Sequence, residues 1–351
     1  MISKFIKFLS LVLILKLDFT FARNASDPNK TNSVFIDILN GVAPTTRLDS
    51  FIKDRIPYNQ KLRPSGINSD GDYIDQDGTL IIYVTTSLKQ IIGLDEKNQI
   101  LTSSFFLLLK WFDPRLMWNP DIYGVNMITV PAAQFWLPDI AIMNAASGSN
   151  LIPYSPNQNI VILSEGLSFL SLSLTSQQTR CKLNVFKYPF DTQTCSIIIG
   201  SWLINNDDLK IDVNDTSFLN PNIYIKNPIW ELTNVRNFTL IDKTRFEQLN
   251  EELEDGQYQS EDIQFDLTLK RNPLYIMING IFPCLVLNCV VLIAFSLPFS
   301  SQVGLCMTSF LTFSVTSVRI AGDIPMQSEY LPLITLYFLL SILYTFLGLT
   351  W

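Results

Sequence analysis

The chain has 351 residues, which is enough for two domains that each bury a core, and only 16% of them are charged. It contains no histidine, so the commonest general base and the commonest transition-metal ligand are missing. We therefore expect neither an enzyme nor a metal site. We also expect no cofactor and no nucleic-acid partner.

Charge is distributed unevenly along the chain. Almost all charged residues lie before Arg271, and the rest of the chain is nearly uncharged. This step in composition predicts a water-soluble domain at residues 23–271 and a membrane domain at residues 272–351.

The first 22 residues are typical of a secretory signal peptide. Lys4 and Lys7 supply a positive start, residues 8–15 form an apolar run, and Ala22 provides a small residue suited to cleavage. A short buried helix is the alternative. A signal peptide would make the following domain extracytoplasmic and would permit disulfides there.

Sequons and cysteines agree with an extracytoplasmic location. All four glycosylation sequons precede Arg271, at Asn24, Asn29, Asn214 and Asn237. Cys181 and Cys195 are the two cysteines of the same region, and they most simply pair with each other.

Hydrophobic patterning predicts a short helix followed by a β-sandwich. Apolar residues at helical spacing between 34 and 56 indicate the helix. Short β-rich runs at Leu80–Val84, Phe105–Trp111 and Ile160–Leu163 follow, separated by turns rich in Asn, Asp, Gly and Pro. Several short strands with regular turns are typical of an all-β sandwich.

Three long apolar stretches follow Pro273. We expect transmembrane helices at about 274–297, 303–321 and 331–351, with a buried soluble helix bundle as the alternative. The first stretch carries no charge over 24 residues, about 36 Å of helix.

The middle stretch is rich in hydroxyl side chains. On a helix, Gly304, Thr308, Leu311 and Val315 share one face. Such a face suits a helix that borders water. Alternatively, the serines and threonines bond their own helix backbone or join neighbouring helices.

More specific motifs identify a family resemblance. Cys181 and Cys195 enclose thirteen residues with Tyr188-Pro189-Phe190-Asp191 in the middle. This resembles the signature loop of Cys-loop (pentameric ligand-gated) ion channels, with tyrosine where phenylalanine is usual. Other segments resemble family motifs in the right order: Leu94–Gln99, which is close to the nicotinic acetylcholine receptor version, Trp118-Asn119-Pro120, Trp136–Ile140, Arg271–Tyr275, Leu297-Pro298 and Ile324-Pro325.

The resemblance implies an extracellular all-β sandwich with an N-terminal helix, followed by an α-helical transmembrane bundle with three spans present and the fourth absent. It also implies a homo- or hetero-pentamer in the plasma membrane, expected at synapses, in which a transmitter bound between subunits opens a central pore. In that arrangement Gly304, Thr308, Leu311 and Val315 line the pore, and Leu311 matches the hydrophobic gate. The loop tip Tyr188-Pro189-Phe190-Asp191, together with Arg271 and Pro325, is expected to couple binding to gating.

Family binding sites surround a transmitter ammonium with aromatic side chains. Trp202 matches the central tryptophan of the principal face, and Phe106 matches the aromatic residue of the complementary face. Met143 stands where tyrosine is usual, Ser260 falls at another tyrosine position, and Tyr258 is a possible substitute. Without the resemblance, Trp202 would be read as a core residue of the sandwich.

The acidic run at 247–262 has two interpretations. It is a solvated loop or a surface that attracts a cationic ligand.

The sequence carries neither of the usual family signatures for ion selectivity. Ser301 and Gln302 replace both the acidic residue of cation channels and the Pro-Ala-Arg sequence of anion channels. Similarity to acetylcholine receptors favours cations and an ammonium-type transmitter. The alternatives are an anion-selective channel, a subunit that assembles without forming agonist sites alone, and, because the chain ends at Trp351, a truncated non-conducting modulatory or decoy subunit.

Overall fold

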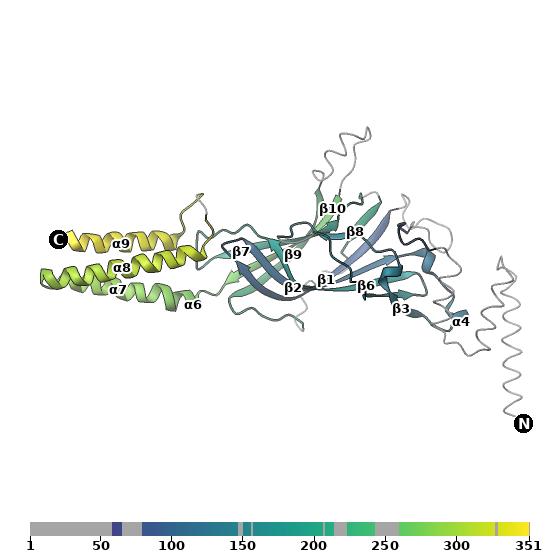
Figure 1. Cartoon of the computed structure of the whole chain (residues 1–351), viewed down its shortest axis with the longest axis horizontal. Coiled ribbons are helices and arrows are strands. Elements are labelled where there is room, and N and C mark those ends of the chain that lie inside the picture. The colour runs from purple at the N-terminus through teal and green to yellow at the C-terminus, as the bar shows by residue number, and fades with distance from the viewer. Residues whose placement is uncertain are drawn as a thin grey trace, which may run out of the picture.

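The computed structural model describes residues 58–64, 79–146, 150–155, 157–205, 208–213, 223–242, 260–326 and 329–350. A β-domain occupies one part of the elongated molecule, and a bundle of long helices occupies the end that carries the C-terminus (Figure 1). The signal peptide, the helix expected between 34 and 56, the sequons at Asn24, Asn29 and Asn214, and Tyr258 lie outside the described residues.

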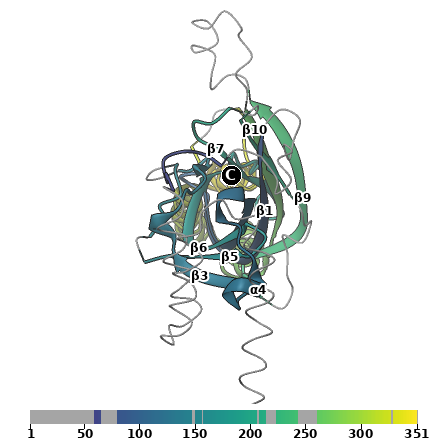
Figure 2. The same cartoon turned by 90° about the vertical axis from the view of Figure 1, so that its right-hand side faces the viewer.

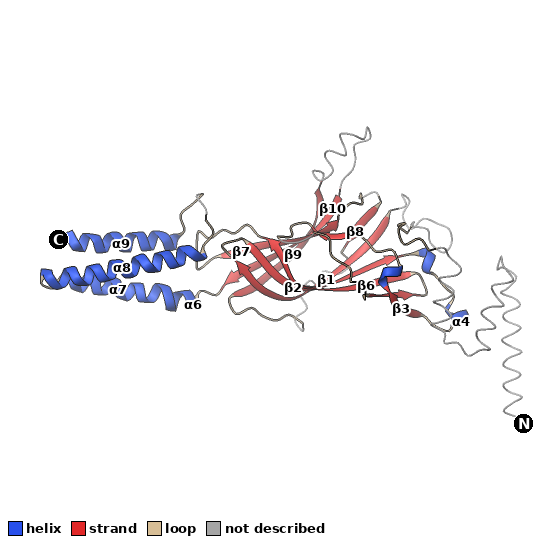
Figure 3. Cartoon of the chain, viewed as in Figure 1, coloured by secondary structure: helices blue, strands red, loops and turns tan. Residues whose placement is uncertain are grey.

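Strands come first along the chain and the long helices last (Figure 3). The strands are β1 (Leu80–Asp95), β2 (Ile100–Phe112), β3 (Met127–Pro131), β4 (Ile140–Ile142), β5 (Asn159–Leu163), β6 (Leu167–Arg180), β7 (Thr192–Ser201), β8 (Leu209–Asp212), β9 (Trp230–Asp242) and β10 (Ser260–Arg271). The short helices among them are η2 (Pro114–Leu116), α4 (Pro120–Tyr123) and η3 (Ala132–Gln134).

The strands form two sheets. One is six-stranded with the order β3-β5-β6-β2-β1-β8, and the other is four-stranded with the order β4-β7-β10-β9. In the view turned by 90°, β9 lies at the outer edge beside β10 (Figure 2). Buried residues from both sheets belong to one hydrophobic cluster, and the predicted β-sandwich is confirmed.

Buried and less buried residues alternate along the strands, and this pattern explains the core. In β1, Leu80, Ile82, Val84, Thr86 and Leu88 are buried while the residues between them are half-buried. A period of two places one set of side chains on the core face, where each fully buried aliphatic side chain contributes about 1.5–3 kcal/mol. The strands predicted at Leu80–Val84, Phe105–Trp111 and Ile160–Leu163 lie in β1, β2 and β5 and are confirmed.

Side-chain hydrogen bonds and helix caps stabilise the turns that follow β2. Asp113 is fully buried, and its carboxylate accepts hydrogen bonds from the backbone N–H and the side chain of Arg115. The hydroxyl of Tyr58 donates to the same carboxylate at 2.9 Å. Asn119 caps α4, and Gly124 ends it in the left-handed region at φ 71°, where glycine is favoured.

Three long helical segments follow β10. The first consists of α6 (Leu274–Ile276), the π-helical turn η5 (Met277–Ile281) and α7 (Phe282–Ala294); α8 spans Phe299–Asp323 and α9 spans Leu333–Thr350. The stretches Leu274–Ala294 and Phe299–Asp323 are long and apolar enough to cross a membrane, whereas the apolar helix at Leu333–Gly348 is shorter. Two candidate spans are therefore present in the described part of the chain.

Candidate functional site: the junction and the ligand-side strands

The predicted disulfide closes the loop between β6 and β7. Cys181 and Cys195 are bonded, with their Cα atoms 5.0 Å apart, and both are buried. Within the loop, Tyr188 and Pro189 are buried, but Phe190 is 59% exposed. The tip therefore turns its tyrosine inward and leaves Phe190 on the surface.

The buried guanidinium of Arg271 holds two carboxylates beneath this loop. Its Nε donates to Asp191 Oδ1 at 2.7 Å and its Nη2 donates to Asp191 Oδ2 at 3.2 Å. Its Nη1 donates to Glu96 Oε1 at 2.6 Å. Only 2% of the Arg271 side chain is exposed, so these charge-assisted bonds lie out of water.

Two aromatic rings also contact the guanidinium. The Arg271 Cζ lies 4.6 Å from the ring centroid of Tyr188 and 4.3 Å from that of Trp230. A planar guanidinium can stack on aromatic faces while its edge donates hydrogen bonds, which an ammonium cannot do. Arg271 therefore joins the disulfide loop, the turn after β1, the start of β9 and the end of β10.

Burial and ion pairing act on the pKa values of this junction in opposite directions. Burial raises the pKa of Glu96 above its ordinary value of 4.5, and the hydrogen bond from Arg271 opposes that shift without cancelling it. Burial also raises the pKa of Tyr188 to about 12. For Arg271, burial acts to lower the pKa, but hydrogen bonds to Asp191 and Glu96 outweigh it and raise the pKa.

The loop also contacts the connection between α8 and α9. The Val185 N–H donates to the hydroxyl of Tyr330 at 3.0 Å, and the Leu333 N–H donates to the Phe186 carbonyl at 3.0 Å. The rings of Phe186 and Tyr330 meet edge to face at 6.0 Å between centroids. Phe186, which precedes the expected loop tip, therefore makes the ring contact with this connection.

The remaining expected coupling residue, Pro325, is buried directly after Ile324, the C-cap residue of α8. A groove of about 780 Å³ runs along the junction and includes Glu96, Tyr188, Arg271 and Asp323 in its lining. Residues of the strand domain and of the helices thus line one groove.

Trp202 directly follows the last residue of β7, and a hydrogen bond of its backbone holds it there. Its N–H donates to the Asp139 carbonyl at 3.0 Å, while Ser201 Oγ and the Leu203 N–H donate to the Asp139 carboxylate at 2.7 and 2.8 Å. The ring is half-buried rather than part of the buried core. Asp139 therefore holds the turn that presents Trp202.

Met143 and Asp262 flank the glycine before that turn. A Cβ built on Gly200 would lie 2.0 Å from Asp262 Oδ1 and 2.8 Å from Met143 Cε. Asp262 is 2% exposed, and its Oδ1 accepts a hydrogen bond from Ser260 Oγ at 2.7 Å. Only a residue without a side chain fits between these groups.

Phe106 lies in β2, in the other sheet. It is half-buried, and Lys89 Nζ lies 5.7 Å from its ring centroid. The described residues do not bring Phe106 and Trp202 into contact within one chain. That separation agrees with a site assembled from two subunits.

Helix α8 has distinct exposed and buried faces. Gly304, Thr308, Leu311 and Val315 are all exposed, and Leu311 is 60% exposed. Hydroxyl groups on the helix donate to carbonyls of its own backbone, as from Thr308 to Leu305 at 2.9 Å. Own-backbone bonding, one of the alternatives from the sequence, is therefore present on the helix that carries this exposed face.

The two positions considered for ion selectivity, Ser301 and Gln302, face different surroundings on α8. Gln302 is buried and its Nε2 donates to the Gly348 carbonyl of α9 at 2.9 Å, whereas Ser301 is exposed. Gln302 therefore faces the neighbouring helix of its own chain.

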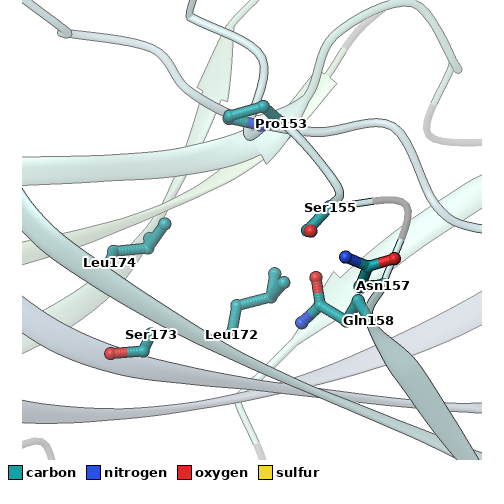
Figure 4. Close-up of a pocket in the computed structure, with 7 residues that line it drawn as sticks. All are labelled: Pro153, Ser155, Asn157, Gln158, Leu172, Ser173 and Leu174. Atoms are coloured by element: carbon teal, nitrogen blue, oxygen red, sulfur yellow. The ribbon is translucent and has the colours of Figure 1, made fainter.

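A separate cavity of about 340 Å³ lies beside β6 (Figure 4). Its lining comes from the segment before β5 and from β6: Pro153, Ser155, Asn157, Gln158, Leu172, Ser173 and Leu174. None of the expected ligand-binding residues lines this cavity.

One expected sequon lies in the described part of the chain. Asn237 is exposed on β9, as are Phe238 and Thr239 of the same sequon. The side chain is therefore accessible to a glycosylating enzyme in this conformation.

Comparison with known proteins now identifies the class. Residues 45–273 match the profile of the neurotransmitter-gated ion-channel ligand binding domain, so the chain belongs to this family of ligand-gated ion channels, which is not a family of enzymes. The recognised resemblance is confirmed.

The similar proteins are neuronal acetylcholine receptor subunits. The chain is 28% identical over 293 residues to the beta-2 subunit of Carassius auratus, a match that covers 82% of this chain and 59% of the relative. It is 29% identical to the beta-4 subunit of Gallus gallus, covering 82% and 57%, and 28% identical to the human beta-3 subunit, covering 78% and 57%. The chain thus spans somewhat more than half the length of the curated relatives it matches.

Proposed function

We propose that the chain is a subunit of a plasma-membrane channel gated by an extracellular transmitter, with residues 23–271 outside the membrane and residues 272–351 forming membrane helices. Five subunits would surround the pore. Family membership supports this proposal, and so do the two helices long enough to span a bilayer. The single observation that carries it is the buried Arg271 junction, where the end of β10 bonds the disulfide loop and the turn after β1 just before the first apolar helix begins.

Two paired strands connect the proposed ligand site to that junction. β7 begins beside Asp191 and ends beside Trp202, while β10 begins at Ser260 and ends at Arg271. They pair without a register shift from Ile263–Ile199 to Lys270–Thr192. A displacement at the Trp202 end can therefore reach the Asp191–Arg271 end through a continuous hydrogen-bonded ladder.

The ligand site we propose lies between subunits. Trp202, Met143 and Tyr258 would belong to the principal face, and Phe106 would belong to the complementary face of the neighbouring subunit. An ammonium-type transmitter is supported by the half-buried Trp202 ring and by the buried Asp262 carboxylate close to Gly200. A transmitter ammonium gains about 0.5–2 kcal/mol from each such aromatic face.

The pore we propose is lined by Gly304, Thr308, Leu311 and Val315 of α8, with Leu311 forming a hydrophobic gate that closes by dewetting. Their shared exposure opposite the buried residues of α8 supports this assignment. Cations are the favoured ions, in keeping with the acetylcholine receptor relatives, and anions are the alternative.

Voltage-clamp recording from cells that express the whole reading frame containing this chain tests the proposal. We expect acetylcholine or tetramethylammonium to evoke a saturable current whose reversal potential follows the sodium gradient. Trp202→Leu should raise the half-maximal concentration by up to about 30-fold, the equivalent of 2 kcal/mol. A current that follows chloride selects the anion channel, and an agonist response unaffected by Trp202→Leu contradicts the site.

A subunit that assembles without completing an agonist site alone is the second candidate. Met143 and Ser260 stand at two positions where family binding sites use tyrosine, and this favours it. Currents that appear only on co-expression with an acetylcholine receptor subunit select this role. Surface assembly that never conducts selects the modulatory or decoy role instead.

A further inference from the structure

Strand β1 bulges at Lys89. Its partners in β2 run from Leu88–Phe105 directly to Gln90–Ser104, so Lys89 is an extra residue without a partner in that strand. A second bulge falls between Ile91 and Gly93. Bulges bend a strand and redirect the side chain of the extra residue.

The redirected Lys89 ammonium lies over Phe106. The distance from Nζ to the ring centroid is 5.7 Å, within the range of a cation–π interaction. In the sheet register the neighbours of Phe106 are Ser87 and Ser173, two small side chains that leave space around the ring. Among the described residues no carboxylate pairs with Lys89, so the ring is the partner of this charge.

The segment before β9 clamps both bulges. The Ile225 N–H donates to the Lys89 carbonyl at 2.8 Å, and Ile225 forms a bridge with Gln90. Asn227 Nδ2 donates to the carbonyls of Ile91 at 2.9 Å and Ile92 at 3.2 Å. The irregular backbone that aims Lys89 is therefore held by hydrogen bonds.

We propose that Lys89 is an internal cation that occupies the Phe106 face and so lowers the affinity of the complementary side for small quaternary ammonium ligands. This inference rests on the proposed function. A ligand ammonium that approaches Phe106 meets a like charge and an occupied ring face. Ligand recognition then depends on Trp202 of the principal face, unless the ligand displaces Lys89.

Lys110 provides a matched control. Its Nζ lies 5.7 Å from the ring of Tyr83 and 5.9 Å from that of Phe169, its two cross-strand neighbours. It makes the same type of contact on the same sheet, in a regular part of the strand and away from Phe106. Lys110→Met therefore removes an equivalent charge without freeing the Phe106 ring.

The first experiment tests the contact itself in the purified full chain in lipid nanodiscs. After reductive methylation with ¹³C-formaldehyde, the dimethyl-Lys89 resonance, assigned by its loss in Lys89→Met, should show an upfield ring-current shift that disappears in Phe106→Leu. A Lys89 resonance at the position of a solvent-exposed lysine overturns the inference. This readout requires no channel activity.

The second experiment titrates tetramethylammonium and follows binding by saturation-transfer NMR. Lys89→Met should bind it about 3- to 30-fold more tightly than the natural chain, Lys110→Met should not, and Lys89→Met with Phe106→Leu should lose the gain. Lys89→Gln repeats the test if Lys89→Met lowers the melting temperature. An unchanged affinity, an equal gain in Lys110→Met, or no saturable binding to Lys89→Met overturns the inference.

These outcomes are separable from those of the channel proposal. Agonist currents together with an unchanged tetramethylammonium affinity in Lys89→Met would reject the role of Lys89 and leave the channel standing. The ring-current shift and the affinity gain without any agonist current would support the role of Lys89 and reject the channel proposal.

Discussion

Arg271 and Asp191 lie 80 residues apart in the chain, yet their side chains meet through two hydrogen bonds of 2.7 and 3.2 Å. The backbone repeats the contact, because the Arg271 N–H donates to the Asp191 carbonyl at 3.2 Å. Arg271 is the last residue of β10, and Asp191 immediately precedes β7. The pair therefore closes the strand ladder directly above the first apolar helix.

Asp191→Asn should destabilise the folded protein by about 3 kcal/mol or more, because it leaves a buried guanidinium with one carboxylate instead of two. The side chains are 2% and 1% exposed, so water cannot replace the lost charge. Thermal unfolding of the purified chain, followed by tryptophan fluorescence, measures the change.

Lys210 and Glu261 supply the control for that prediction. Their 3.7 Å pair leaves 48% of the lysine side chain exposed, so Lys210→Met should cost less than about 1 kcal/mol. Equal effects of the two substitutions would show that the Arg271 junction has no special energetic role.

Glu96 should make stability depend on pH. Its folded pKa is raised above its ordinary 4.5, so the folded state binds the proton more tightly than the unfolded chain does. The stabilisation that comes from this tighter proton binding is fully present below pH 4.5, and it is lost as the pH rises through the raised pKa of Glu96. The melting temperature of the natural chain relative to that of Glu96→Gln should therefore fall from pH 4 to pH 7; a constant difference would refute the shift.

Gly200→Ala should destabilise the chain by about 1–3 kcal/mol, the usual range for overpacking. The new Cβ would lie 2.0 Å from Asp262 Oδ1, so a buried carboxylate or the Trp202 turn must move. Gly93→Ala is the comparison, because a Cβ at Gly93 has no heavy atom within 4 Å. Chemical denaturation of both variants measures the difference, and equal midpoints would disprove the close packing at Gly200.

Tyr330→Phe should weaken coupling between the loop and the helices. It keeps the ring against Phe186 but leaves the N–H of the buried Val185 without its acceptor, at a cost of about 1–3 kcal/mol. Tyr330→Leu removes the ring contact as well and should be more severe. Dose–response recordings from both variants check the order, and natural sensitivity in Tyr330→Leu would exclude this contact from gating.

Several elements were predictable because they follow from local chemistry. The alternation in β1 identifies a strand with one core face, and two cysteines in one extracytoplasmic region identify the disulfide. The family resemblance predicts a gate at Leu311, and Leu311 lies on the exposed face of α8.

Other contacts cannot be predicted from the sequence, because the periodicity of apolar residues does not encode how loops and bulges direct side chains. The sequence does not reveal the ring contact of Phe186 with Tyr330, because the direction of a loop depends on contacts distant in sequence. Lys89 reads as an ordinary strand residue until the bulge displaces it. Glu96 was visible only as part of a motif, and its pairing with Arg271 spans 175 residues.

Agonist currents recorded from Leu311→Ser test whether a ligand opens a pore that Leu311 gates. A polar ring at a dewetted constriction should hydrate it, so we expect a lower half-maximal agonist concentration or a current without agonist. Leu340→Ser, at a comparably exposed leucine of α9, should leave sensitivity unchanged. Unaltered gating in Leu311→Ser, or an equal shift in Leu340→Ser, would contradict the account.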